Sequence, residues 1–372
     1  MPPLNLLIKP ASSLCNMRCK YCFYADVSQN REIPSYGIMS EETLELLVQR
    51  AFAYATGSVG FAFQGGEPTL VGLPFYRKLI QLQKKYNTRG LPVSNSIQTN
   101  GLLLDETWAA FFAEHRFLVG LSLDGTKEAH NALRIDSQGQ GTYDAVTSAA
   151  ALLKRFGVDF NILCVVNNFV ARHPQKVYQQ LRQYQYLQFI PCLDSFSGKQ
   201  EPFSLTPQRY GAFLNATFDL YYRDFMAGNY VSVRNFDNYV RMLQGAPPES
   251  CAMNGICTCY FVVEAEGSVF PCDFYVLDRW KLGNIREDSL AQLLKSPTAA
   301  EFVEISKTRA ASCNSCPWLR LCRGGCRRER EPLADGNLSL NRFCESYRTF
   351  FAHSTEKLYQ IARLSRSGGR PL

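Results

Sequence analysis

Cysteine is the residue type in this chain whose number and spacing point most directly to chemistry. The sequence has 14 cysteines in 372 residues: three lie between positions 15 and 22, two stand alone at 164 and 192, and nine fall between 251 and 344. Disulfide frameworks belong mainly to small secreted proteins, whereas clustered cysteines in a larger cytosolic chain indicate metal. The clustering therefore predicts metal sites near both ends of the chain.

The first cluster is a single loop with the spacing CxxxCxxC, formed by Cys15, Cys19 and Cys22. A 4Fe–4S cluster normally takes four cysteines. Three would leave one iron with an open position, by the logic that separates catalytic from structural zinc sites. The alternative is a zinc site with a fourth ligand from elsewhere. The chain has four histidines and none lies near this loop, which favours iron and sulfur.

A regular scaffold must position these cysteines, and the first 200 residues alternate between short strands and amphipathic helices. The predicted strands are residues 4–8, 59–64, 94–99, 118–123, 160–166 and 187–191, and the predicted helices are 41–55, 75–87, 106–115, 142–156 and 175–185. Ser40 and Asp105 are expected to begin two of these helices. Six βα units in series predict a parallel sheet with right-handed crossovers. They are too few for an eight-stranded barrel, so we expect an α/β fold with a partial (β/α)6 TIM-like barrel.

Polar motifs follow the predicted strands, at the end of the sheet where such folds place their chemistry. They are the cysteine loop, residues 65–67, residues 98–100, and Ser122 with Asp124. A long helix is predicted over 207–227. The later sequence is rich in cysteine, with a hairpin of strands 261–264 and 268–271 and a closing helix over 346–363. We expect two domains, residues 1–230 and 231–372.

With these elements in place, the motifs resemble the radical S-adenosylmethionine superfamily. The resemblance rests on the cysteine loop, with Tyr21 before its last cysteine, and on Gly65-Gly66-Glu67-Pro68, which is similar to the superfamily's GGEP motif. It implies that the open iron binds the methionine end of S-adenosylmethionine and that one-electron cleavage gives a 5′-deoxyadenosyl radical. It also implies contacts of the cofactor with the residues at the matching positions, Tyr21, Gly65, Gly66, Glu67, Ser122, Arg134 and Leu193.

The later cysteines resemble the SPASM extension of this superfamily, which binds two auxiliary 4Fe–4S clusters. The resemblance implies one cluster on Cys251, Cys257, Cys272 and Cys326, and another on Cys313, Cys316, Cys322 and Cys344. Three clusters in total would leave Cys164, Cys192 and Cys259 without a ligand role. The CxxC spacing also suits a pair of zinc ribbons, and spacing alone leaves that alternative open.

Longer stretches, among them residues 6–13, 61–70 and 271–278, look like anaerobic sulfatase-maturating enzymes over nearly the whole chain. Those enzymes oxidise a Cys or Ser in a sulfatase to Cα-formylglycine after a hydrogen atom is taken from Cβ. The matching position makes Asp273 the implied base. Four polar residues near strand ends, Tyr24, Gln64, Gln98 and Asn100, are candidates to hold the substrate. The implied partners are an unfolded or nascent sulfatase and a reductant of the flavodoxin or ferredoxin type.

Other functions remain to be weighed against this one. A different SPASM peptide maturase, forming thioethers or epimerising residues, is the nearest rival, and a non-catalytic iron–sulfur or zinc protein is another. The formal net charge of +7 is modest, and the densest arginine run is interleaved with cysteines, so charge compensation of clusters is preferred to nucleic-acid binding. No apolar run approaches the roughly 18 residues of a membrane span, and no signal-peptide core is evident, so we expect a cytoplasmic protein. Sequence alone does not decide between Cys and Ser substrates.

Overall fold

The computed structural model describes residues 3–331 and 340–366. The chain forms two compact units, each assembled from separate stretches of sequence. The first unit comprises Met1–Ser122, Arg134–Phe160 and Thr258–Glu304. The second comprises Leu123–Leu133, Asn161–Cys257 and Ile305–Leu372.

The first unit is built on four parallel strands extended by a hairpin from the later sequence. In the order β10-β9-β8-β1-β2-β3-β4, its strands are β10 (Gly283–Asn284), β9 (Ser268–Phe270), β8 (Phe261–Val263), β1 (Leu4–Ile8), β2 (Val59–Phe63), β3 (Val93–Thr99) and β4 (Leu118–Ser122). Strand β8 lies parallel to β1, with Leu6 opposite Phe261 and Ile8 opposite Val263. Strands β8 and β9 form the predicted antiparallel hairpin, but its pairing with β1 was not predicted.

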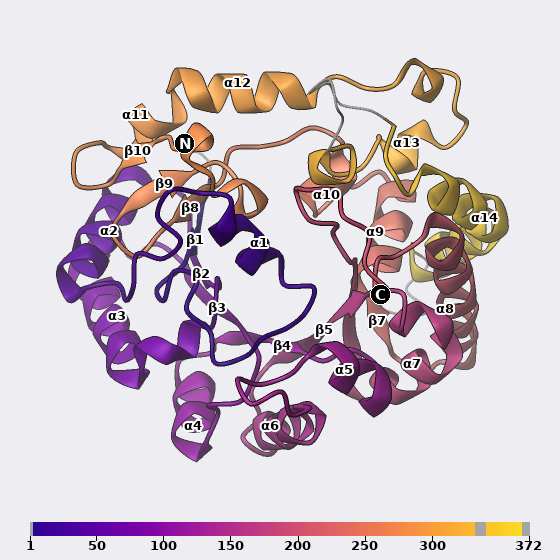
Figure 1. Ribbon diagram of the computed structural model, residues 1–372, viewed down its shortest axis with the longest axis horizontal. Coiled ribbons are helices and arrows are strands. Elements are labelled where there is room, and N and C mark those ends of the chain that lie inside the picture. The colour runs from indigo at the N-terminus through magenta and orange to yellow at the C-terminus, as the bar shows by residue number, and fades with distance from the viewer. Residues whose placement is uncertain (1–2, 332–339, 367–372) are drawn as a thin grey trace. The chain divides into compact units, whose positions relative to one another are not determined.

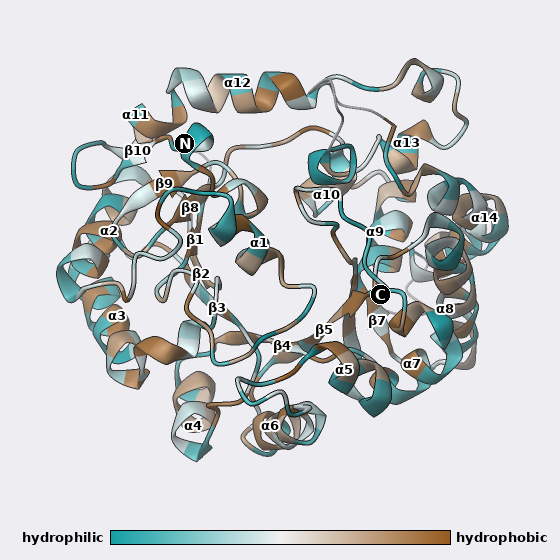
Figure 2. Ribbon diagram, viewed as in Figure 1, coloured by the Kyte–Doolittle hydropathy of each residue, from teal (hydrophilic) through white to brown (hydrophobic). Residues whose placement is uncertain are grey.

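Helices of the first unit cover the strands, and the four that were predicted begin close to their predicted starts. They include α1 (Phe23–Gln29), α2 (Glu41–Tyr54), α3 (Leu73–Tyr86), α4 (Glu106–Glu114), α6 (Tyr143–Arg155) and α11 (Leu290–Leu294) (Figure 1). The predicted caps are confirmed: Ser40 accepts a hydrogen bond from the Thr43 N–H and Asp105 from the Trp108 N–H. Brown is common along the strands in Figure 2, as expected when helices cover them, although β3 carries several polar residues.

The second unit continues the alternation with strands β5 (Phe160–Val166), β6 (Tyr186–Pro191) and β7 (Ser232–Val233), which pair in parallel. Its helices are α5 (Lys127–Leu133), α7 (Pro174–Leu181), α8 (Pro207–Ala227), α9 (Arg234–Leu243), α10 (Cys251–Asn254), α13 (Leu319–Cys322) and α14 (Cys344–Arg366). Helix α14 packs on α8, where a Cβ on Gly211 would lie 3.2 Å from the Ser346 Cα. Helix α12 (Pro297–Ser306) spans the boundary between the two stretches Thr258–Glu304 and Ile305–Leu372.

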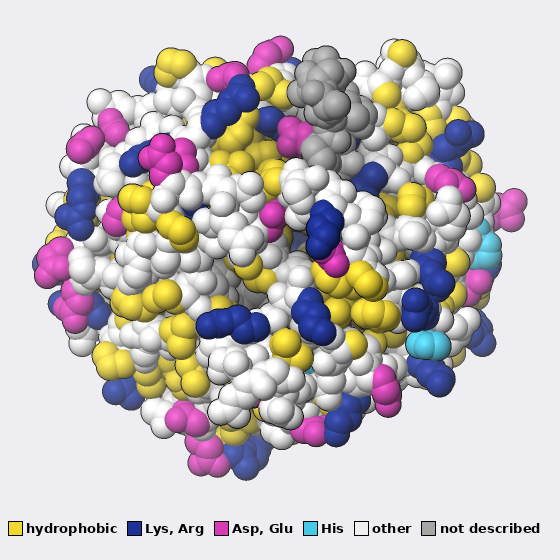
Figure 3. All heavy atoms as spheres, in the orientation of Figure 1, with side chains coloured by type: hydrophobic (Ala, Val, Ile, Leu, Met, Phe, Trp, Pro, Cys, Tyr) yellow, Lys and Arg dark blue, Asp and Glu magenta, His cyan; other side chains and the backbone are white. Residues whose placement is uncertain are grey.

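These elements confirm the predicted fold class, an α/β fold with a mostly parallel sheet. All six predicted strands form, together with the long helix and the closing helix. Helices α1, α5, α9, α10, α11, α12 and α13 were missed, as were the two-residue strands β7 and β10. The predicted domain boundary at residue 230 stays a prediction. Among the described residues, no helix combines the length and hydropathy that a membrane crossing requires. On the face seen in Figure 3, acidic and basic side chains are interspersed.

Candidate active site

The cysteine loop follows β1 directly and carries three half-buried thiols. Cys22 stands at the N-cap of α1, and Cys15 accepts hydrogen bonds at its Sγ from the Met17 N–H at 3.4 Å and from the Asn100 amide at 3.8 Å. Donors aimed at sulfur stabilise a thiolate. Burial nevertheless raises the pKa of Cys15 to about 11, and a metal that binds the sulfur would displace its proton.

The donor chemistry of this loop fits an iron–sulfur cluster. All fourteen cysteines belong to described residues and none is in a disulfide. Three thiols on one loop, free of disulfides and partly covered by protein, are a donor set suited to iron and sulfur. Within residues 3–331 and 340–366, no three His, Cys, Asp or Glu side chains are placed to hold a single metal ion. That finding concerns one ion and does not test a cluster.

The GGEP loop after β2 packs closely against the cysteine loop, and two glycines make this possible. Gly65 has φ +123°, in the range that favours glycine, and a Cβ on Gly66 would lie 1.9 Å from the Leu14 carbonyl oxygen. The Gly66 N–H donates to the Ser12 carbonyl and the Glu67 N–H to the Leu14 carbonyl. Backbone contacts therefore hold the two motif loops together.

Glu67 joins this loop to the end of β3. Its Oε1 accepts from the Thr69 N–H, the Thr69 hydroxyl and the Thr99 hydroxyl, at 3.1, 2.7 and 2.7 Å. Its Oε2 accepts from the Asn100 N–H at 2.8 Å. Burial raises the pKa of Glu67, and the hydrogen bonds from Asn100 and Thr69 oppose that shift. The carboxylate is thus engaged by four protein donors, which sequence reasoning did not anticipate.

The other expected cofactor contacts fall in both units. In the first, the Arg134 guanidinium lies 5.4 Å from the centroid of the Tyr21 ring, and Gln98 donates to the Ser122 hydroxyl at 3.0 Å. Tyr21, Arg134 and Ser122 are residues that the resemblance implies around the cofactor, and Gln98 is a strand-end candidate to hold the substrate. Leu193 follows β6 in the second unit.

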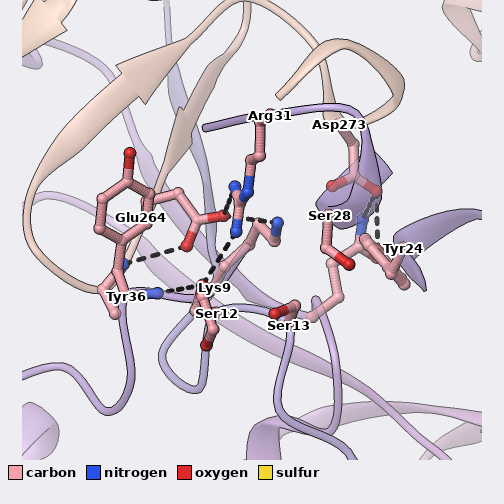
Figure 4. A network of polar contacts seen from close by, with 12 residues as sticks. Lys9, Ser12, Ser13, Tyr24, Ser28, Arg31, Tyr36, Glu264 and Asp273 are labelled. Atoms are coloured by element: carbon pink, nitrogen blue, oxygen red, sulfur yellow. Dashed lines mark hydrogen bonds and ion pairs between the residues drawn. The ribbon is translucent and has the colours of Figure 1, made fainter. Parts of the chain in front are cut away.

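Asp273 lies just after the β8–β9 hairpin and is 4% exposed. Its Oδ2 accepts hydrogen bonds from the Tyr24 hydroxyl at 2.7 Å and the Gln64 amide at 2.9 Å (Figure 4). Its Oδ1 is buried and has no hydrogen-bond partner among the described residues. Burial raises the pKa of Asp273 to about 6, although the Lys9 charge and the Tyr24 hydrogen bond pull it down. A buried carboxylate with one oxygen held and the other unused is suited to accept a proton.

A buried ion network adjoins Asp273, and sequence reasoning missed it. Lys9 and Arg31 each donate to Glu264 Oε1 at 2.6 Å, with all three side chains at most 2% exposed (Figure 4). Burial raises the pKa of Glu264, but the charges of Lys9 and Arg31 outweigh it and leave the pKa below its usual value. A faint signal was present, since Lys9 and Glu264 each follow a short apolar strand.

The four candidate substrate residues divide between these networks. Tyr24 and Gln64 bind Asp273, Gln98 binds Ser122, and Asn100 donates to Asn16 Oδ1 at 2.8 Å as well as contacting Cys15. All four lie in the first unit. Gln64, Gln98 and Asn100 stand at strand ends, and Tyr24 lies in α1 beside the cysteine loop.

The later cysteines occupy loops and helix ends. In the second unit, Cys326 Sγ accepts from the Arg328 N–H at 3.4 Å, and Cys344 is the first residue of α14. Burial raises the pKa of Cys322 to about 11. Cys272 lies in the first unit, where the Tyr260 hydroxyl is 3.6 Å from its Sγ. The second unit holds the other seven implied auxiliary ligands, Cys251, Cys257, Cys313, Cys316, Cys322, Cys326 and Cys344.

The three remaining cysteines have no ligand role in the resemblance. Cys164 is fully buried on β5, as a core residue would be, and Cys192 is 2% exposed. The Cys259 Sγ lies 3.8 Å from the Ala299 carbonyl oxygen.

Comparison with known proteins defines the class of this site. Residues 10–181 match the radical SAM superfamily, and residues 251–317 match SPASM, an iron–sulfur cluster-binding domain. The chain is therefore a radical S-adenosylmethionine protein with a SPASM domain. It belongs to the anaerobic sulfatase-maturating enzymes, because a cysteine-type member from Clostridium perfringens is 50% identical over 97% of this chain and 99% of that protein.

Two further similarities refine this picture. A serine-type anaerobic sulfatase-maturating enzyme from Bacteroides thetaiotaomicron is 32% identical over 94% of this chain and 89% of that protein. A solved structure of a protein called anSMEcpe, with bound AdoMet and a Cp18Cys peptide, superimposes with a TM-score of 0.93 at 49% identity, covering 97% of this chain and 99% of that one. The family prediction from sequence is confirmed.

Proposed function

We propose that this protein oxidises a cysteine in an unfolded sulfatase chain to Cα-formylglycine. Family membership supports the reaction, and the greater identity to cysteine-type than to serine-type relatives supports the substrate. The observation that carries the proposal is the Asp273 carboxylate. Its Oδ2 is fixed by two donors while its Oδ1 is buried with no partner among the described residues.

The cofactor sites are proposed from the resemblance. Cys15, Cys19 and Cys22 would hold the cluster that binds S-adenosylmethionine, with Tyr21, Gly65, Gly66, Glu67, Ser122, Arg134 and Leu193 around the cofactor. Two auxiliary 4Fe–4S clusters would take the ligand sets given above, for three clusters in all. The chemistry that these groups supply when bound is one-electron cleavage of S-adenosylmethionine and removal of a hydrogen atom from the substrate.

Asp273 supplies the proton acceptor in this proposal. Oxidation of a cysteine side chain to a thioaldehyde removes one hydrogen atom from Cβ, one proton from sulfur and one electron, and the auxiliary clusters, when bound, would accept that electron. The proton passes to Oδ1, because that oxygen has no competing donor among the described residues. Tyr24 and Gln64 keep the carboxylate in place by holding Oδ2. Water then hydrolyses the thioaldehyde to the aldehyde and releases hydrogen sulfide.

The partners follow from the same chemistry. The substrate is a nascent or unfolded sulfatase, and a flavodoxin or ferredoxin supplies electrons. We place the protein in the cytoplasm, because reducing conditions keep cluster ligands as free thiols. Gln98 and Asn100 are proposed to contact the substrate backbone.

The test is anaerobic turnover of two peptides of about 15 residues that differ only in Cys or Ser at the target position. Mass spectrometry follows the peptide and 5′-deoxyadenosine together. Formylglycine from the Cys peptide, with slower conversion of the Ser peptide, is expected. If deoxyadenosine forms while both peptides stay unchanged, the protein cleaves the cofactor but acts on a different substrate, and the proposal is refuted.

A pair of variants tests the role of Asp273. Asp273→Asn removes the acceptor and should reduce formylglycine formation by about 100-fold or more, the usual scale for a general base. Iron content should stay at the wild-type value. Asp278→Asn, which alters an exposed carboxylate five residues further on, is the matched control. Full activity of Asp273→Asn would remove this residue from the mechanism.

A further inference from the structure

Lys9 is the first residue after β1, and it is buried although it is a lysine. Its side chain is 2% exposed, and its Nζ donates to Glu264 Oε1 at 2.6 Å. Burying an ammonium group is costly unless an anion compensates it. Glu264 provides that anion, but Arg31 already pairs with the same oxygen at the same distance. One carboxylate needs only one cation to balance its charge, so the pairing with Glu264 does not explain why Lys9 is buried in addition to Arg31.

A second contact distinguishes Lys9 from Arg31. The Lys9 ammonium lies 5.5 Å from the centroid of the Tyr24 ring, within the range of a cation–π interaction. Arg31 lies instead over the Tyr36 ring, at 5.2 Å. Figure 4 shows Lys9 between Glu264 and the Tyr24–Asp273 pair. The two cations thus share one anion but contact different aromatic rings.

Tyr24 is the link from Lys9 to the carboxylate. Its hydroxyl donates to Asp273 Oδ2 at 2.7 Å. The terminal torsion of an aspartate is soft and does not settle into sharp rotamers, so the direction of Oδ1 depends on what holds Oδ2. A ring that turns away would leave Gln64 as the one described donor to Oδ2. Fixing the ring therefore fixes where Oδ1 points.

We propose that Lys9 is a positioning residue that orients Tyr24, and through it Asp273, for proton acceptance. This inference rests on the proposed function. Glu264 holds the Lys9 ammonium on one side while the Tyr24 ring accepts it on the other. The hairpin strand β8 and strand β1 thereby act together on a side chain of α1. Lys9 itself touches neither substrate nor cofactor in this role.

The test compares Lys9→Met with Arg31→Met in the cluster-loaded enzyme. Each variant removes one buried cation from Glu264 and leaves the other in place, so both should lose thermal stability. Only Lys9→Met removes the cation over Tyr24. We expect it to form deoxyadenosine but to yield about tenfold less formylglycine per deoxyadenosine, the scale of a desolvated cation–π contact. Arg31→Met should keep the wild-type ratio within about twofold.

A second variant, Lys9→Gln, keeps the test decisive if Lys9→Met folds poorly. The glutamine amide can still donate a hydrogen bond to Glu264, and Arg31 stays paired with that carboxylate, so stability should be closer to wild type while the low ratio persists because no charge lies over the Tyr24 ring. A wild-type ratio in either Lys9 variant, or an equal loss in Arg31→Met, would overturn the proposal. Asp273→Asn separates the two hypotheses. If it abolishes formylglycine while Lys9→Met does not lower the ratio, the proposed function stands and the role of Lys9 falls.

Discussion

Replacing Glu67 with glutamine tests whether this carboxylate supports the fold of the motif loops or mainly binds the cofactor's ammonium group. In the structure it accepts four hydrogen bonds, three at Oε1 and one, from the Asn100 N–H, at Oε2. Glutamine can keep an oxygen at the Oε1 position. Its NH₂ group would then face the Asn100 N–H, so two donors would oppose each other in a buried place.

The size of the effect follows from these contacts. A hydrogen bond to a charged group contributes about 1.5–3 kcal/mol, and the Asn100 bond is lost. The three bonds that remain weaken because charge-assisted bonds are roughly twice as strong as neutral ones. Together these losses amount to about 3 kcal/mol. For 372 residues, an unfolding entropy of about 2.1 cal/mol/K per residue converts this loss into roughly 4 °C of thermal midpoint.

The assay measures the thermal midpoint without S-adenosylmethionine and, separately, the dissociation constant of S-adenosylmethionine by equilibrium binding. Glu114→Gln, at a side chain 74% exposed, is the control. If Glu67 mainly supports the loop, the midpoint falls before any cofactor is added. A midpoint within about 1 °C of wild type, together with much weaker cofactor binding, would refute this reasoning and favour direct ligation of the ammonium group.

Three further predictions concern the loops around the site. Because the pKa of Glu264 is lowered in the fold, its contribution to stability is present above the usual glutamate pKa and is lost as pH falls through the folded pKa. The thermal unfolding midpoint of Glu264→Gln, followed by circular dichroism, should therefore fall less than that of wild type when the pH is lowered below the usual glutamate pKa. Gly66→Ala should lower iron content severely, since its Cβ would meet the Leu14 carbonyl, whereas Gly57→Ala, with no contact closer than 3.8 Å, should keep wild-type iron. Asp194 follows Leu193 in the sequence and forms an ion pair with Arg342, which holds this segment in place. Asp194→Asn weakens that pair, so it should weaken S-adenosylmethionine binding by about three- to tenfold in the same equilibrium assay.

Local patterns were enough to predict most of the scaffold. The strands are short runs bounded by turn residues, and the helices begin at Ser40 and Asp105, whose side chains accept from backbone donors as expected. Short elements were harder to predict. Helix α1 has seven residues and begins directly after the last cysteine of the loop, so the motif obscured it. Helix α9 follows β7, a strand of two residues, with no capping side chain to mark its start.

The motif residues could be predicted because their spacing is local, but their partners could not. Glu67 was singled out as part of GGEP, yet its donors come from Thr69, Thr99 and Asn100, and the latter two lie more than 30 positions away. Lysine is rarely fully buried unless it is paired, yet Lys9 is buried. Its burial depends on Glu264, 255 positions later. A single sequence carries no periodic signal for such pairs.

One pairing accounts for most of what the sequence did not reveal. Strand β8 adds to the sheet beside β1, in a register that sets Ile8 opposite Val263. The next residues are Lys9 and Glu264, so the same register brings their charges together. The chain then turns at Gly267, returns along β9 and reaches Asp273 beside Tyr24 and Gln64. Side chains alternate between the two faces of a strand, so a slip of one residue would turn Glu264 away from Lys9. The ion network and the Asp273 site therefore depend on the same strand register, and the buried pair of Lys9 and Glu264 is one of the interactions that would oppose a slip.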